Sequence, residues 1–295
     1  STDFNAGGPT YSNKNNGYNV TQFYGCDVHP VDQNYFLAGA QDNNTQRFTQ
    51  PGMNSTNPVV GGDGGIPHIR QTDGVLQIAA TTGNNYYRSL NSGATFSSLG
   101  AGVNNNRGQF INPTDYDNAS TLYCGDDANQ YYVVSNLDGA PSGSIKALGI
   151  LGNREVTAVK VDPFTSTTVW LGCSFGGQVP MVVKVTNANT TPTVQINSTI
   201  PVAANANISS IDVDPVDGRV LATISNYGIV SVWLSTNDGA SWTNIEGNLP
   251  DMPVRWGLFA PASAILSGTT QGGILLATEL GVWTTSQVNG AATIW

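Results

Sequence analysis

The chain has 295 residues, of which 11% are charged, and its formal net charge is −9. The acidic balance argues against nucleic acid or an anionic membrane as a partner, and no apolar run reaches the roughly 18–20 residues of a membrane helix. Three cysteines, Cys26, Cys124 and Cys173, are too few for a disulfide framework or a zinc knuckle. Each ends a strand-like run, so we expect small buried thiols, with one disulfide as the alternative.

A repeat begins at residue 21 and continues to the end of the chain. Each copy has an alternating apolar run, a turn that usually contains proline, and a second apolar run that ends in a small residue. The turns are marked by Pro30, Asp73, Pro113, Pro163, Pro215 and Pro261. A period of roughly 40–50 residues with about four short strands is typical of a propeller blade. The sequence therefore predicts an all-β chain, a β-propeller with about six four-stranded blades visible, in a seven-bladed or larger propeller.

The predicted blades are consecutive. Residues 1–20 are too polar for a blade and are predicted to be the tail or closing strand of a preceding one, and the final residues 293–295 read as a strand. The expected blades span residues 21–58, 59–104, 105–153, 154–204, 205–252 and 253–295.

Two turns inside this repeat share a hairpin motif. Each has serine, then asparagine two positions later, glycine after two more, and an aromatic three further on, between strand-like runs. Asparagine can bond backbone N–H groups in such a turn, and glycine accepts positive φ. The two copies are Ser89, Asn91, Gly93 and Phe96, and Ser235, Asn237, Gly239 and Trp242. A less regular copy occupies residues 135–139.

This motif resembles the Asp box of sialidase-like and sortilin-like β-propellers. The strings at residues 248–256 and 277–283 resemble long secreted Bacteroidetes surface proteins that carry such BNR repeats and often use type IX secretion. The resemblance covers residues 21–295, and it implies a secreted or cell-surface propeller module of a larger protein. The Asp box is structural in that family, and the Arg-Ile-Pro segment of true sialidases is absent from this chain.

The strand order also predicts which loops share a face. If the proline turns join the first and second strands of each blade and the Asp boxes join the third and fourth, the remaining loops lie together on the opposite face. Charged and aromatic residues gather in those loops, which are expected to bind a ligand. The candidate ligand-binding residues are Asp42, Asp63, Arg107, Asp126, Asp127, Arg154, Arg255, Trp256 and Glu279.

Asp63 stands among four glycines, in a string that resembles the glycine-flanked acid near one catalytic position of xyloglucanase-type propellers. A glycosidase needs a second carboxylate at about 5–9.5 Å, for which Asp42, Asp126 or Glu279 are the candidates. The alternative for this string is a tight turn. Calcium could be held by Asp42, Asp126 and Asp127; otherwise no cofactor is expected.

The sequence therefore favours a non-catalytic module, an adhesin or scaffold, that binds glycan or protein. Its other expected partners are further domains of the same polypeptide or the secretion machinery. A glycoside hydrolase is the alternative, and insertion into a membrane is not expected.

Overall fold

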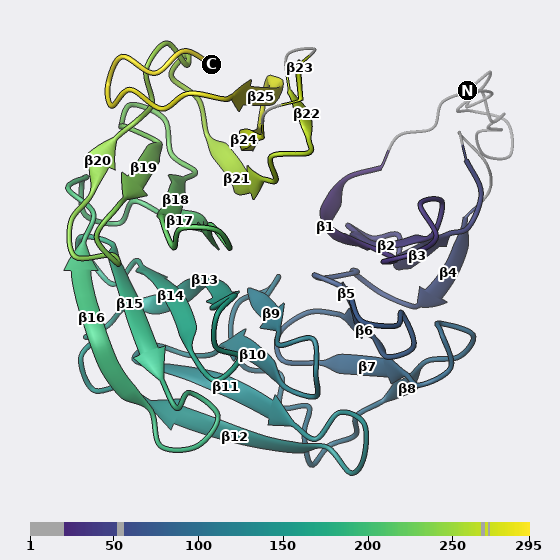
Figure 1. Cartoon of the computed structure of the whole chain (residues 1–295). Helices are drawn as coiled ribbons and strands as arrows, with labels where there is room; N and C mark the ends of the chain where they lie inside the picture. Colours follow the sequence, from purple (N-terminus) through teal and green to yellow (C-terminus); the bar gives the residue numbers. More distant parts are fainter. Residues whose placement is uncertain (1–20, 52–55, 267–268, 271) are drawn as a thin grey trace, which may run out of the picture.

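The chain folds as a β-propeller, shown in Figure 1 as a computed structural model that describes residues 21–51, 56–266, 269–270 and 272–295. Six blades follow one another in an arc around a central channel, with the first strand of each blade innermost. The all-β propeller prediction is confirmed. The predicted tail at residues 1–20 lies outside the described residues, and no helix in the described part could span a membrane.

The first five blades are four-stranded antiparallel sheets in which consecutive strands are neighbours. Their bounds are β1 (Phe23–Val28), β2 (Phe36–Ala40), β3 (Thr45–Phe48) and β4 (Asn57–Val60); β5 (His68–Ile69), β6 (Gln77–Ala80), β7 (Tyr86–Ser89) and β8 (Ser97–Ser98); β9 (Thr114–Tyr116), β10 (Leu122–Gly125), β11 (Gln130–Ser135) and β12 (Ser142–Ala147); β13 (Glu155–Val161), β14 (Val169–Ser174), β15 (Met181–Thr186) and β16 (Thr193–Thr199); β17 (Ile208–Val213), β18 (Val220–Ile224), β19 (Val232–Ser235) and β20 (Thr243–Asn244).

The sixth blade differs from the sequence prediction. Its described sheet has three strands, β21 (Val254–Ala260), β24 (Gly273–Thr278) and β25 (Gly281–Thr285), and a small hairpin, β22 (Ile265–Leu266) with β23 (Thr269–Thr270), is inserted after the first. Residues 293–295 are not a strand. Trp295 instead binds the fifth blade: its backbone N–H donates to Asn248 Oδ1 at 2.7 Å and its indole to the Ile245 carbonyl at 2.9 Å. These contacts explain why an apolar ending that reads as a strand adopts irregular structure.

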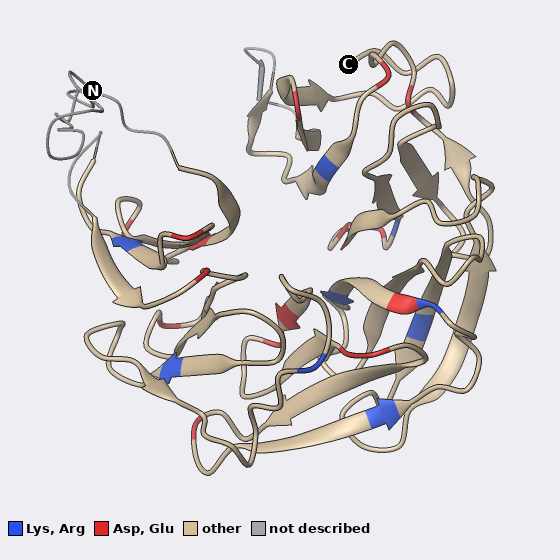
Figure 2. Ribbon diagram, turned by 180° about the vertical axis from the view of Figure 1, so that it is seen from behind, with Lys and Arg blue, Asp and Glu red and all other residues tan. Residues whose placement is uncertain are grey.

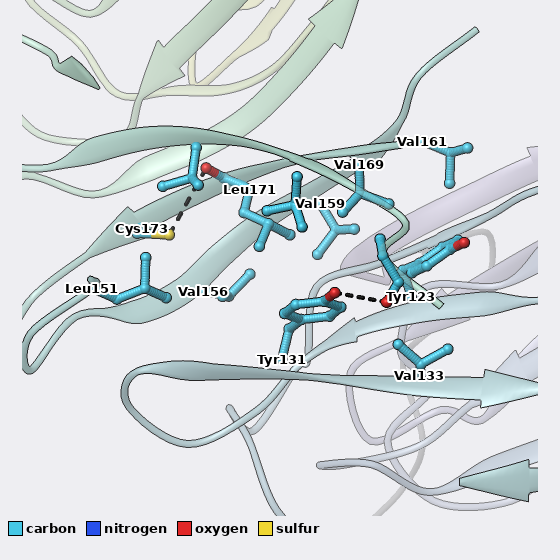
Figure 3. Packing of buried hydrophobic residues seen from close by; sticks show 13 residues of the cluster. Tyr123, Tyr131, Val133, Leu151, Val156, Val159, Val161, Val169, Leu171 and Cys173 are labelled. Atoms are coloured by element: carbon cyan, nitrogen blue, oxygen red, sulfur yellow. Dashed lines mark hydrogen bonds between the residues drawn. The ribbon is translucent and has the colours of Figure 1, made fainter. Parts of the chain in front are cut away.

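The core lies between adjacent blades. Figure 3 shows such a layer, in which Tyr123 and Tyr131 of the third blade face Val159 and Leu171 of the fourth. The Tyr131 hydroxyl, buried in this layer, donates to the carbonyl of Ala188 at 2.7 Å. Alternate residues of a strand face opposite neighbouring blades, which is why second strands such as β14 and β18 are buried on both faces, whereas the outermost β16 alternates between exposed and half-buried residues.

The two Asp-box copies form the same hairpin. In each, the asparagine Oδ1 accepts the backbone N–H two positions after the glycine, Thr95 or Ser241, at 3.0 Å. The serine Oγ accepts the glycine N–H at 2.9 Å in both. The side chains of Phe96 and Trp242 are half-buried, and the Trp242 indole donates to Ser198 Oγ at 2.8 Å.

The cysteines are all free thiols. Cys124 and Cys173 are buried as expected, and burial raises the pKa of the Cys173 thiol to about 12. Cys26 is exposed, so the expectation that it is buried is wrong. It lies on β1 in the first blade, whose outward face has no described neighbouring blade (Figure 1).

Candidate functional site

All nine candidate residues lie at one end of the propeller. Each is in a loop between the second and third strands of a blade, in a loop that leads into the next blade, or at the start of β21. The proline turns and the Asp-box hairpins lie at the other end of the strands, as the predicted strand order requires. Figure 2 shows acidic and basic positions around the central opening as well as at loop tips.

One group is an ion pair network on the third blade. Arg107 Nε lies 2.9 Å from Asp126 Oδ1, and its Nη2 lies 2.8 Å from Asp127 Oδ2. The Asp126 side chain has 0% exposure, and Asp127 Oδ1 also accepts the N–H of Gly108 at 3.2 Å. These three residues therefore join two loops of one blade, and their charges are already paired.

Arg154 is also bound to groups of the protein itself. Its residue exposure is 9%, and its guanidinium donates to the carbonyls of Val179 at 2.7 Å and Leu151 at 3.1 Å. A buried guanidinium that caps carbonyl groups of neighbouring loops stabilises them and leaves little of itself for a ligand.

The glycines around Asp63 allow two blades to approach closely. A Cβ on Gly64 would lie 2.6 Å from the Asn44 carbonyl oxygen and 2.7 Å from the Gly39 Cα, so a larger residue does not fit there. Asp63 Oδ1 accepts the backbone N–H of Asp42 at 2.8 Å, where Asp42 has a φ of 55°. The glycine-rich segment at residues 61–65 is thus a tight turn between two blades, and the hydrogen bond from Asp42 to Asp63 stabilises it.

The third group joins the fifth and sixth blades. Arg255 Nη2 is paired with Glu279 Oε1, and the Tyr227 hydroxyl donates to Glu279 Oε2 at 2.9 Å. The hydrogen bonds from Arg255 and then Tyr227 lower the pKa of the Glu279 carboxyl. Glu279 is thereby held in its ionised form.

Arg255, Trp256 and Glu279 line the mouth of the central channel, a cavity of about 520 Å³ to which all six blades contribute. The aromatic side chains of Trp256 and Phe23 line the same cavity, and these residues are 41% and 44% exposed. Among its described lining residues Glu279 is the only carboxylate. Asp42, Asp63, Arg107, Asp126, Asp127 and Arg154 are not among them.

A second cavity of about 590 Å³ shares Phe23, Arg255 and Trp256 with the first, and it is lined by further charged residues that the sequence analysis does not predict as a site. Asp27, His68, Asp115 and Lys160 line it, and each occupies the same position on the innermost strand of its blade. Desolvation raises the pKa of the Asp27 carboxyl to about 6 and lowers that of His68 to about 4. In the sequence Asp27, His68 and Lys160 each stand between two apolar residues, a pattern that indicates a polar position on an otherwise apolar strand, whereas Asp115 follows Thr114 and lacks this signal.

These inner acids bind the following blade. Asp27 Oδ2 accepts the N–H of Ile69 at 2.6 Å, and Asp115 Oδ2 accepts that of Val161 at 2.7 Å. In the fifth blade, Asp212 Oδ2 accepts the N–H of Phe259 at 2.7 Å. The deep charges therefore hold blades together.

Within the described residues, no three histidine, cysteine, aspartate or glutamate side chains come together as a metal site would require. Asp42, Asp126 and Asp127 thus do not form one cluster.

Comparison with known proteins identifies the fold. A GH74 enzyme from Niastella koreensis superposes with a TM-score of 0.62 at 19% identity, over 92% of this chain and 46% of the enzyme. An ancestral GH74 enzyme gives a TM-score of 0.67 at 14% identity, over 91% of this chain and 37% of that one. The chain thus spans less than half of either, and identities this low show the fold alone. No protein-family model and no curated protein matches the sequence.

Proposed function

We propose that this propeller is a non-catalytic module that binds a carbohydrate chain at the mouth of its central channel. The observation that carries the proposal is the pair of half-exposed aromatics, Trp256 and Phe23, on one cavity with the Arg255–Glu279 ion pair. Aromatic faces stack on sugar rings, and a few fixed polar groups orient the hydroxyls.

The charges at the mouth favour binding over hydrolysis. A glycosidase places two carboxyl groups on either side of the scissile bond, and its acid has a raised pKa. Glu279 is the only carboxylate among the described lining residues, and its pKa is lowered by Arg255 and Tyr227. Asp63, the other expected catalytic acid, accepts a backbone hydrogen bond outside this cavity.

The likeness of fold to GH74 enzymes favours a second candidate, a glycoside hydrolase of the xyloglucanase type. In that case Asp63 and Glu279 or Asp42 would act as the carboxylate pair. The secreted or cell-surface location expected from the Asp-box resemblance suits either role, as does a place beside other domains of one polypeptide.

Affinity electrophoresis against a panel of plant and microbial polysaccharides tests the proposal. We expect retardation by at least one glycan, and a loss of affinity of at least tenfold in Trp256→Ala. Phe164→Ala is the matched control, because Phe164 is 59% exposed in the loop between β13 and β14, at the other end of the blades. Equal retardation of the parent and Trp256→Ala would overturn the site.

A reducing-sugar assay on the same panel separates the two candidates. Binding without sugar release is the expected result. Release that disappears in both Asp63→Asn and Glu279→Gln would establish the hydrolase instead.

A further inference from the structure

The second cavity of the channel, of about 590 Å³, has more acidic than basic charge in its described wall once the existing ion pairs are counted. We propose that this cavity binds the protonated amine of an amino sugar, so that the glycan held at the channel mouth is one with free amino groups. The inference rests on the proposed function, because the two cavities share Phe23, Tyr24 and Trp256 and are therefore adjoining.

Asp27 and Asp115 are the carboxylates of this cavity, and neither forms an ion pair with another described residue. Each of their four oxygens accepts a backbone N–H at 2.6–3.0 Å, and Asp27 Oδ1 also accepts from Gln71 at 3.3 Å. A carboxylate offers about four acceptor sites, so both groups keep capacity for a further donor. Burial, with the charge of Asp115 as a further cause, raises the pKa of Asp27 to about 6, as expected for a carboxylate without a paired cation.

The two basic residues that line the cavity are already engaged. Lys160 Nζ lies 3.0 Å from Asp212, and Arg255 is paired with Glu279. The cavity wall and these two partners together carry four carboxylates and two cations, which leaves two negative charges when all are ionised. Buried charges are normally paired, and a bound ammonium would supply the missing partner.

The other features of the cavity favour an organic ammonium over a metal ion. Within the described residues, no three side chains of the metal-binding types come together as a metal site would require. Phe23 and Trp256 line the cavity with half-exposed aromatic side chains. Aromatic faces attract ammonium groups and also stack on sugar rings.

His68 favours an amino sugar over a simple amine. This residue lines the cavity and is 9% exposed; its Nε2 lies 2.8 Å from Thr114 Oγ1, whereas its Nδ1 has no hydrogen bond to a described residue. Desolvation lowers the pKa of His68 to about 4, so the ring is neutral near pH 7 and one nitrogen carries the proton. A sugar hydroxyl both donates and accepts, and therefore satisfies Nδ1 in either tautomer, whereas an ammonium can only donate.

Three β-1,4-linked pentasaccharides that differ only at carbon 2 of each ring form a matched series of ligands. Glucosamine carries an ammonium there, N-acetylglucosamine an acetamide and glucose a hydroxyl. Isothermal titration calorimetry just above the Asp27 pKa of about 6 measures their affinities for the parent. We expect the glucosamine pentamer to bind about tenfold more tightly than either of the other two.

Asp27→Asn and Asp115→Asn remove the charge and keep an oxygen for the backbone N–H of the following blade. We expect each to lower the affinity ratio of the glucosamine to the glucose pentamer about threefold, and the double variant to bring it to about one. Asp32→Asn is the matched control, because Asp32 is exposed in the loop between β1 and β2 and does not line the cavity. It removes the same charge and should leave the ratio unchanged.

Equal affinities of the parent for the glucosamine and glucose pentamers would overturn the inference and leave the proposed function standing. A preference for glucosamine that persists undiminished in the folded double variant would also overturn it. If a variant fails to fold, the comparison of the three pentamers with the parent still decides.

Monomers separate this inference from the proposed function if no pentamer binds. Glucosamine hydrochloride is compared with glucose plus an equal concentration of sodium chloride, by the thermal midpoint of the parent. A higher midpoint with glucosamine, absent in Asp27→Asn, would retain the amine site while the proposed glycan-chain function fails. Equal midpoints with the two mixtures would overturn both.

Discussion

At the scale of single residues, the innermost strand of each of the first five blades carries one polar side chain that binds the next blade. Asp27, Asp115 and Asp212 occupy this position in the first, third and fifth blades, and each accepts a backbone N–H from the following blade. Lys160 occupies it in the fourth blade and lies 3.0 Å from Asp212. These charged side chains can lie near the channel because hydrogen-bond and ion-pair partners from neighbouring blades compensate for their burial.

Asp27 gives the fold a pH dependence whose sign is fixed by its raised pKa. Because the folded state holds this proton more tightly than the unfolded state, its contribution to stability falls as pH rises from about 3.8 to about 6. Asp27→Asn removes that penalty while its amide oxygen can still accept the Ile69 N–H. We therefore expect the variant to be more stable than the parent at pH 7.5, by at most about 3 kcal/mol, and to show no such gain at pH 4.

Denaturant unfolding at the two pH values measures this difference. His68, whose pKa is lowered to about 4, acts with the opposite sign, so its contribution is lost as pH falls from about 6.5. Comparing variant with parent at each pH cancels that contribution. A gain of equal size at both pH values would refute the assignment.

Asp212 has two partners from neighbouring blades, the Lys160 ammonium and the Phe259 N–H. Substitutions at Asp212 therefore measure how much this position contributes to stability. Asp212→Ala leaves both donors without their acceptor, and we expect a loss of about 1–3 kcal/mol in the free energy of unfolding. Asp212→Asn should recover part of the loss because it restores an acceptor for Phe259. Chemical denaturation of the three proteins measures this, and identical losses for both variants would argue against the backbone bond.

At the scale of elements, the hairpins between third and fourth strands are fixed from two sides. Their own serine and asparagine side chains close the turn. A basic residue on the third strand of the preceding blade then reaches them: Arg47 donates to the Gly93 carbonyl at 2.5 Å, and Lys184 lies 2.6 Å from Asp238. Several of the few basic residues are therefore used to join blades.

Asn237→Ala should cost about 1–2 kcal/mol, because the Ser241 N–H and the Ser235 hydroxyl both lose their acceptor. Asn237→Asp keeps an oxygen at that place and should retain most of the stability. Thermal unfolding of both variants checks this. Equal midpoints for the alanine variant and the parent would mean that the turn does not depend on its side chain.

Elements with a local cause could be predicted from the sequence. The proline turns and the hairpins around Asn91 and Asn237 follow from backbone preferences. The regular spacing of the turns along the chain predicted the propeller. The irregular path to Trp295 was missed because its contacts with Asn248 and Ile245 are distant in sequence. The hairpin β22–β23 was missed because it interrupts the repeat that the other blades follow. The site was predicted in part: the loops share a face, but Arg107 and Arg154 pair within the protein, which sequence spacing cannot indicate.

At the scale of the whole molecule, stability depends on whether a position has a blade on each side. Val213 and Val28 are the same residue at equivalent positions, 3% and 48% exposed. Val213→Ala should cost about 2 kcal/mol, whereas Val28→Ala should stay within about 0.5 kcal/mol of the parent. Parallel denaturant titrations compare the two, and equal costs would show that the exposed end of the arc is covered.

The inner carboxylates have a consequence for hydrogen exchange beside the channel. Their bonds join the first blade to the second, the third to the fourth and the fifth to the sixth, and at the same depth His68–Thr114 and Lys160–Asp212 link the intervening neighbours through side chains. Each described blade is therefore tied to the next beside the channel by a polar group of its innermost strand. Amide protons of Ile69, Val161 and Phe259 should therefore exchange late with deuterium.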